Sequence, residues 1–175
     1  MPLVLNGTTG VQDNSGAFVA GTAVASTSGT SIDFTGIPSW VKRVTVMFNE
    51  VSTNGSSIVQ VQIGSGSVTT SGYKSNSSYS AANAAQYGYA TSGFILEASG
   101  VAASTVQRSG SIILSLFGSN VWVASGDIAS GPTQLITNSC GGVSPTLGGV
   151  LDRVRITTVN GTDAFDAGSI NILYE

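Results

Sequence analysis

Carboxylates are the side chains of this sequence that come closest to catalytic or metal-binding chemistry, because the chain contains no histidine. Without histidine, neither Ser-His-Asp nor Cys-His catalysis can be built in its usual form, and no histidine-containing metal site can exist. Asp163 and Asp166 fall in one predicted loop, where they are weak candidates for calcium ligands; turn formation and a surface role are the alternatives. A glycosidase pair drawn from Glu50, Glu97 and these two aspartates is a further alternative, but the sequence places no two of them at a working separation. We therefore expect no catalytic residue and no cofactor, and we predict that the protein is not an enzyme.

The segment 64–90 is the candidate binding region, since it is small, polar, weakly periodic and rich in tyrosine. Tyrosine among serine, glycine and asparagine is the composition of adaptable contact surfaces, and loops on a rigid sandwich often carry recognition. In this interpretation the tyrosine rings stack on the sugar faces of a glycan. In the alternative interpretation the segment is a long surface meander whose tyrosines cap the sheet. The candidate ligand-binding residues are Tyr73, Tyr79, Tyr87 and Tyr89.

The single cysteine, Cys140, excludes an intramolecular disulfide. No side chain of the sequence is a candidate base for its thiol, so we predict a buried structural cysteine. Arg153 and Arg155 alternate on an outward-facing side of a predicted strand. We expect them to be solvated there, or to pair with acidic residues of a neighbouring strand or subunit.

The stretch Val41–Ile63 carries the strongest signal for secondary structure. Val44, Val46 and Phe48 share one parity in its first half, and β-branched residues alternate with glutamine in its second half. Asn54-Gly55 lies between the two halves, and this combination predicts a β-hairpin with one buried face. Phe48→Ala and Val154→Ala are expected to destabilise the core by about 2–4 kcal/mol.

Further period-2 runs extend over the rest of the chain, with no helical periodicity between them. We predict an all-β fold: an antiparallel two-sheet jelly-roll-like sandwich of about eight strands. Residues 1–30 form an extended N-terminal arm or edge strand in this interpretation, and residues 31–175 form the sandwich domain. The other predicted strands are Ser31–Phe34, Gly93–Glu97, Ser111–Phe117, Val121–Ser125, Gln134–Thr137, Leu151–Val159 and Ser169–Tyr174. Gly118-Ser119-Asn120 is expected to form a hairpin turn between two of them. In Leu151–Val159, we expect Val154 and Ile156 to point inward.

The composition narrows the possible partners. Only 9% of the 175 residues are charged, the net charge is −3, and glycine occurs 23 times. Six basic residues cannot form a stripe that follows phosphates, so we expect no nucleic-acid binding. No apolar run is long enough to span a membrane, and the first residues lack the pattern of a conventional signal peptide. A weakly charged surface repels its neighbours weakly and suits packing in an assembly.

Two long stretches resemble short tailed-bacteriophage virion proteins of the tail-fibre-like or appendage type. They are TSIDFTGIPSWVKRVTVMFNEVSTNG at Thr30–Gly55 and LDRVRITTVNGTDAFDAGSINILYE at Leu151–Glu175. VWVASG at Val121–Gly126 is similar to the same proteins, and LNGTTGV at Leu5–Val11 is similar to segments of phage fibres. Together these stretches cover somewhat less than half of the chain.

The resemblance implies a non-enzymatic structural protein of a phage virion, in a tail fibre or appendage, or as a capsid decoration or head fibre. It implies self-association, with a homotrimer favoured, and attachment to another virion protein. The protein would be made in the bacterial cytoplasm and end in the virion. The alternative is a carbohydrate-binding module that the particle presents to a host receptor.

Overall fold

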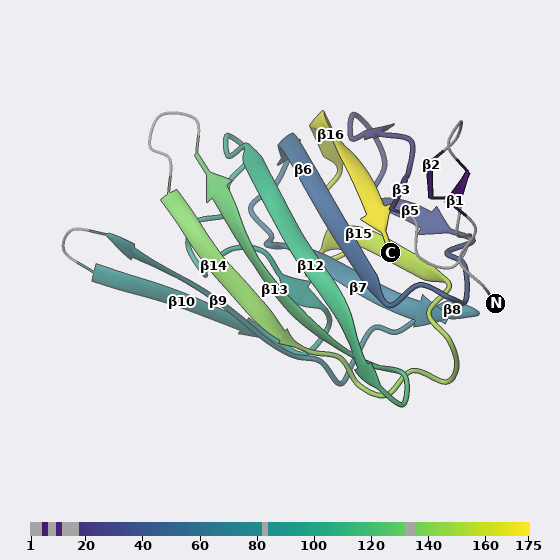
Figure 1. Cartoon of the computed structure of the whole chain (residues 1–175). Helices are drawn as coiled ribbons and strands as arrows, with labels where there is room; N and C mark the ends of the chain where they lie inside the picture. The colour runs from purple at the N-terminus through teal and green to yellow at the C-terminus, as the bar shows by residue number, and fades with distance from the viewer. Residues whose placement is uncertain (1–4, 7–9, 12–17, 82–83, 132–135) are drawn as a thin grey trace.

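The computed structural model describes residues 5–6, 10–11, 18–81, 84–131 and 136–175. The regular structure in these ranges is entirely β, in two antiparallel sheets packed as a sandwich (Figure 1). In the same ranges no helix is long and apolar enough to cross a membrane. The predicted all-β, two-sheet fold is confirmed, although most of the predicted strands are longer in the structure and further short strands are present.

The large sheet has nine strands and the small sheet has five. The large sheet follows the order β10 (Ala84–Ala90), β9 (Lys74–Ala81), β14 (Ile136–Val143), β13 (Val121–Ser130), β12 (Arg108–Gly118), β6 (Arg43–Thr53), β16 (Phe165–Tyr174) and β3 (Val19–Ala20), with β4 (Val24–Ala25) also on β16. The small sheet follows the order β11 (Phe94–Ile95), β7 (Val59–Ser65), β15 (Arg153–Thr158) and β5 (Ser31–Thr35), with β8 (Ser67–Val68) also on β7. Two further short strands, β1 (Leu5–Asn6) and β2 (Gly10–Val11), pair with each other.

The predicted hairpin over Val41–Ile63 is wrong in its pairing. Its halves form β6 and β7, but β6 pairs with β12 and β16 in the large sheet, whereas β7 pairs with β15 and β11 in the small sheet. The segment between them therefore crosses from one sheet to the other. Alternation shows which side chains are buried, and it does not distinguish a neighbour in the same sheet from one in the facing sheet.

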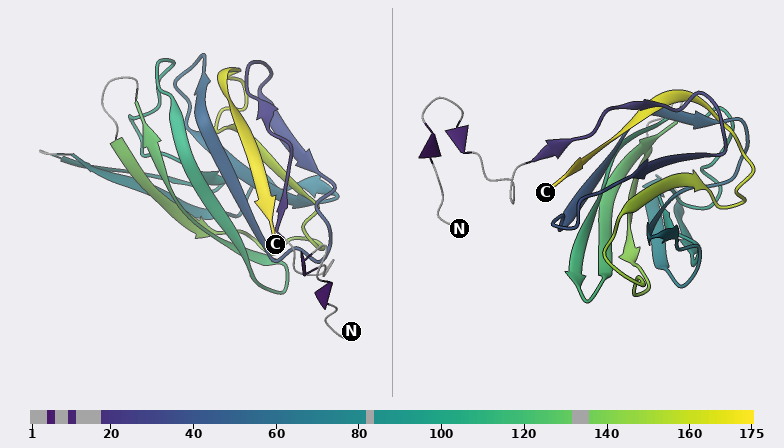
Figure 2. Two further views of the ribbon diagram at one scale, coloured as in Figure 1. Left: turned by 45° about the horizontal axis from the view of Figure 1, so that its top comes forward. Right: turned by 90° about the vertical axis from the view of Figure 1, so that its right-hand side faces the viewer.

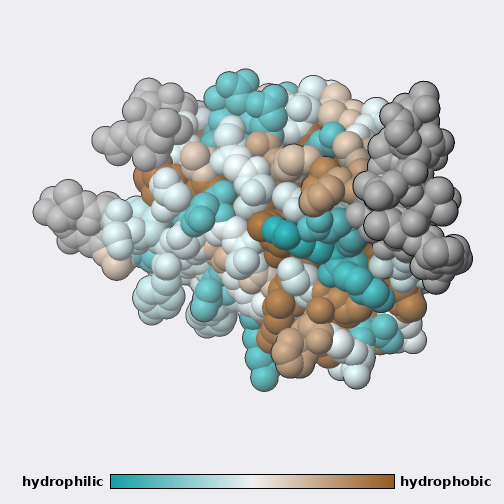
Figure 3. Space-filling model, in the orientation of Figure 1, coloured by the Kyte–Doolittle hydropathy of each residue, from teal (hydrophilic) through white to brown (hydrophobic). Residues whose placement is uncertain are grey.

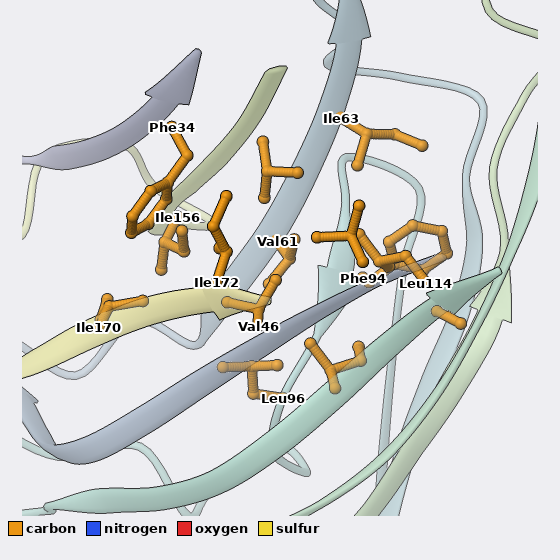
Figure 4. Packing of buried hydrophobic residues seen from close by; sticks show 14 of the residues in the cluster. Phe34, Val46, Val61, Ile63, Phe94, Leu96, Leu114, Ile156, Ile170 and Ile172 are labelled. Carbon is orange, nitrogen blue, oxygen red and sulfur yellow. The ribbon is translucent and has the colours of Figure 1, made fainter. Parts of the chain in front are cut away.

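The core lies between the sheets, and the predicted inward-facing residues are in it (Figure 4). Val46 of the large sheet lies close to Val61 of the small sheet in this view, and Leu114 and Ile63 belong to the same buried cluster. Phe48 is buried, so the predicted register of β6 is confirmed. Val154 and Ile156 of β15 are buried as predicted.

The turn Gly118-Ser119-Asn120 was expected to join two strands, and that prediction is confirmed. β12 and β13 form an antiparallel pair in which Gly118 lies opposite Val121. Ser119 and Asn120 both have positive φ, 48° and 60°. Positive φ at both central residues is the geometry of the type I′ turn, whose twist matches that of the flanking strands.

The segment 64–90 is more regular than its sequence indicates. It contains β8 and the paired strands β9 and β10, and β9 continues the large sheet through its pairing with β14. Figures 1 and 2 show β9 and β10 at one end of the large sheet, where they project from the sandwich. Serine, alanine and asparagine have low β-propensity and no alternation, so the hydrogen bonds of a neighbouring strand decide their conformation.

The described part of the N-terminal segment from residue 18 onward lies along the edge of the large sheet. Val24 is opposite Ile170 and Ala20 is opposite Leu173 of β16. The hydroxyl of Ser26 donates to the carbonyl of Ala167 at 2.8 Å. β3 and β4 are thus part of the sandwich edge.

Candidate binding surface

Tyr73 is a core residue and is not available to a ligand. Its hydroxyl accepts a hydrogen bond from the backbone N–H of Ile63 at 2.9 Å and lies 3.0 Å from the carbonyl oxygen of Thr69. Its ring packs edge-on against Phe94, with ring centroids 5.0 Å apart. Burial raises the pKa of the Tyr73 hydroxyl to about 12. The prediction that this tyrosine binds a ligand is therefore wrong.

We expect stability to fall with rising pH through the titration of Tyr73. The unfolded chain loses this proton near pH 10, whereas the folded protein keeps it until about pH 12. The contribution is therefore complete below pH 10 and is lost as the pH rises to 12, by about 2–3 kcal/mol in total. Burial also raises the pKa of Cys140 from 9 to about 12, which acts in the same direction. Denaturant unfolding between pH 9 and pH 12 measures how steeply the free energy of unfolding falls with pH. Tyr73→Phe should make this fall shallower, because only the Cys140 contribution stays. The same steepness in the variant and the wild type would contradict the role of Tyr73.

Tyr87 and Tyr89 lie on one outward-facing side of β10, with 72% and 80% of their surfaces exposed. On β9, Ser78 is opposite Tyr87 and Asn76 is opposite Tyr89, so these four side chains share a face. We call this set the tyrosine platform. Tyr79 lies opposite Gln86, on the other face of the ribbon, and is half-buried.

The tyrosine platform continues onto the outer face of the large sheet. β14 places Ser139 beside Ser78 and Gly141 beside Asn76. Figure 3 views the molecule from this side and shows a largely pale, weakly polar surface with scattered hydrophilic and hydrophobic residues. Two exposed rings beside hydroxyl and amide groups can stack on one face of a ligand and hydrogen-bond its edge.

Asp163 and Asp166, the calcium candidates, are both engaged in hydrogen bonds with other parts of the chain. Asp163 accepts from the backbone N–H of Ser57 at 2.8 Å and from the amide of Asn160 at 2.7 Å. Asp166 accepts from the hydroxyl of Ser52. Within the described ranges, no group of three or more acidic, cysteine or histidine side chains is arranged to hold a metal ion. Asp163 thus joins the β15–β16 loop to the β6–β7 connection, whereas Asp166, at the start of β16, bonds to Ser52 of the paired strand β6.

Gly55→Ala should disrupt this junction, because a Cβ at Gly55 would overlap the carboxylate of Asp163. We expect a loss of about 1–3 kcal/mol in the free energy of unfolding, as for other overpacked sites. Gly148→Ala is the matched control, since a Cβ there meets nothing within 4 Å. When Asp163 is already alanine, Gly55→Ala should lower the free energy of unfolding much less than it does in the wild type, because the overlapping carboxylate is gone. If the losses of the two single variants simply added up in the double variant, the proposed overlap would be wrong.

Glu97 is excluded from a glycosidase pair because it is fully buried against Arg108. The guanidinium binds both carboxylate oxygens, with N–O distances of 2.8 and 2.7 Å. Arg108 also donates to the carbonyl of Val106 at 3.1 Å. The sequence offered no signal for this ion pair, since its partners lie in different elements. The pair secures the 96–107 loop beneath the large sheet.

Arg155, Arg153 and Cys140, which the sequence also singled out, have structural roles, whereas Glu50 is exposed. Arg155 forms a bidentate ion pair with Asp33 on the neighbouring strand β5. Pairing with an acidic residue of a neighbouring strand was one of the two expectations for Arg155. Arg153 pairs with Asp152. Cys140 is buried as predicted. Burial keeps its thiol protonated, because its pKa is raised to about 12.

A polar groove of about 320 Å³ lies on the outer face of the small sheet. Gln60 and Gln62 line it, but both are buried, and each hydrogen-bonds to Ser92. Their amides are therefore used within the fold. The groove has hydroxyl and amide groups and no aromatic ring among its lining residues, so the tyrosine platform is the better candidate for a stacking ligand.

No protein-family model matches this sequence, and no curated protein matches it.

Proposed function

We propose that this chain is a non-enzymatic structural protein of a tailed-bacteriophage particle, a jelly-roll module that self-associates and attaches to another virion protein. The observation that carries the proposal is the path of the chain between the two sheets. Eight strands form the two facing layers: β4, β5, β6, β7, β11, β12, β15 and β16. From each of these strands to the next, the chain changes sheet, except from β7 to β11, which are both in the small sheet. They lie in the orders β4–β16–β6–β12 and β5–β15–β7–β11. Such double-sheet jelly rolls recur in viral capsid proteins and in lectins.

The surface and the carboxylates support a structural role. Side chains on the outer face of the large sheet are mostly small and uncharged, including Ser78, Ser111, Ser125 and Ser139. Such a face can pack against a neighbour at little desolvation cost compared with a charged one. Glu97, Asp163 and Asp166 were candidates for catalysis or metal binding, and all three carboxylates accept structural hydrogen bonds. The resemblance of Thr30–Gly55 and Leu151–Glu175 to phage virion proteins points to the same assembly.

Purified phage particles test the proposal directly. Gradient-purified virions of a phage that encodes this chain should contain it at a fixed copy number by quantitative mass spectrometry. Light scattering on the free chain should give a multiple of 17.6 kDa, with three copies the favoured number. Deleting residues 1–17 leaves β3 and β4 in place, and a stable oligomer after this deletion would assign the first residues to virion attachment. Absence of the chain from purified virions would overturn the proposal.

The tyrosine platform favours a second candidate function, recognition of a host-surface carbohydrate. Its support is the pair of exposed rings on one face of β10, beside Asn76 and Ser78. A glycan array with Tyr87→Ala plus Tyr89→Ala should then lose signal. Phe117→Ala is the control, because Phe117 is 79% exposed and lies on β12 near the Ser119-Asn120 turn. Equal binding by both variants would reject this candidate.

A further inference from the structure

The last strand of the large sheet, β10, has one free edge. β10 pairs with β9 on one side, and no backbone hydrogen bond joins Ala84–Ala90 to any other described element. Ser99 and Ile95 cover the inner face of the strand at Gly88. The edge of β10 that points away from β9 is not covered by another described element, and the face with Tyr87 and Tyr89 is exposed to solvent. The edge therefore presents backbone N–H and C=O groups that a further strand can pair with.

This edge lacks the features that normally prevent strand addition. β10 is seven residues long, AAQYGYA, with no charged residue and no proline. The other sheet edges in the described ranges are protected by contrast. β3, β4 and β11 have two residues each, and β5 carries Asp33 in an ion pair with Arg155. Short strands and charges are the devices by which proteins protect sheet edges, so β10 is the exception here.

We propose that β10 pairs edge to edge with β10 of a second copy of this chain, in antiparallel orientation. The inference rests on the proposed self-association and names a surface for it. Because a two-fold contact joins two copies, it predicts a dimer step in place of the direct trimer that the resemblance favours. In such a two-fold contact, the same strand of both copies lies side by side, and residues near the two-fold axis face themselves or a close neighbour in sequence. A charged residue at this edge would therefore lie near the same charge of the second copy and repel it. β10 is neutral, and Tyr87-Gly88-Tyr89 reads the same in both directions.

The symmetry of this short sequence determines a favourable register. With Gly88 opposite Gly88 of the second copy, each Tyr87 lies opposite Tyr89 of the other copy. Directly opposite residues of an antiparallel pair share a face, so the four rings form two neighbouring cross-strand pairs on the outer side of the joined sheets. Aromatic cross-strand pairs are among the stabilising ones. The projection of β9 and β10 from the sandwich gives the two bodies room on either side of the contact (Figure 2).

The test compares the mass of three variants of the full chain over a concentration series by sedimentation velocity. Tyr87→Lys plus Tyr89→Lys places like charges across the contact and should weaken dimerisation at least about tenfold. Phe117→Lys is the control, since it also replaces an exposed aromatic ring with a charge, but on β12, four strands away from β10 in the large sheet. Its association should equal that of the wild type. Tyr87→Thr plus Tyr89→Thr keeps strand-forming residues and removes the rings, so dimers should persist while glycan stacking is lost.

Amide hydrogen exchange gives a readout that is independent of the variants. Amides of residues 84–90 in the wild type should exchange more slowly at high than at low protein concentration, whereas those of β12 should not change. An oligomer that the lysine pair leaves intact, with no concentration-dependent protection of β10, would overturn the edge contact and leave self-assembly standing. A chain that is monomeric at every concentration would overturn both. A trimer without a dimer step would also exclude this two-fold contact.

Discussion

Glu97→Ala is expected to lower the free energy of unfolding by about 3–5 kcal/mol, the cost of leaving one member of a buried ion pair without its partner. Glu97 and Arg108 have no exposed side-chain surface, and the guanidinium would lose both of its carboxylate contacts. The backbone N–H of Val59, 3.4 Å from the same carboxylate, would also lose a partner. Chemical denaturation of the variant and the wild type measures the difference.

Asp33→Ala is the control, because it removes the same kind of ion pair from the surface. The pair between Asp33 and Arg155 is more than one-third exposed on both sides, so its loss should cost no more than about 1 kcal/mol. A further variant, Glu97→Leu with Arg108→Met, should be more stable than Glu97→Ala, since no unpaired charge stays buried. If Glu97→Ala and Asp33→Ala had equal effects, the buried pair would not have the proposed role.

Trp122→Ala should also destabilise the protein strongly, and we expect it to lower the free energy of unfolding by about 3–5 kcal/mol. Trp122 is the largest of the fully buried side chains and belongs to the core cluster between the sheets. Truncation to alanine removes the whole indole from a site that the surrounding strands cannot fill by small movements. Thermal or denaturant unfolding measures the loss.

Trp122→Phe separates the packing of this ring from its polar group. The indole N–H is buried and has no hydrogen-bond partner among the described residues. An unpaired buried donor costs about 1–3 kcal/mol, so phenylalanine removes a penalty while it leaves part of the volume filled. We expect Trp122→Phe to lose less than half as much stability as Trp122→Ala. Equal losses for the two variants would contradict the absence of a partner for the indole.

Local patterns in the sequence predicted much of the burial correctly. The alternation of Val44, Val46 and Phe48 identified the inner face of β6, and Val154 and Ile156 identified that of β15. Side chains with one apolar face must be buried whichever strand lies beside them, so period-2 alternation carries this information locally. The β12–β13 hairpin was predictable for a related reason, because its two-residue turn keeps the partners adjacent in sequence.

The candidate site was predicted only in part, since the four tyrosines were treated as one group. Tyr73 is in the core, Tyr79 faces the other side of the ribbon, and Tyr87 and Tyr89 are exposed together. Their different environments follow from the pairing of β9 with β10 and with β14. That pairing joins small polar residues through backbone hydrogen bonds, which have no signature in side-chain hydropathy.

The sequence by itself determined the all-β class, the inner faces of the long strands and the turn between β12 and β13, because these depend on residues close together in the chain. Only the tertiary structure decided that β6 and β7 belong to opposite sheets, that Glu97 meets Arg108 beneath the large sheet, and that β10 ends that sheet with a free edge. Each of these features depends on contacts between distant parts of the chain. Many alternative pairings satisfy the same alternation, and the packing of the two sheets against each other selects one of them.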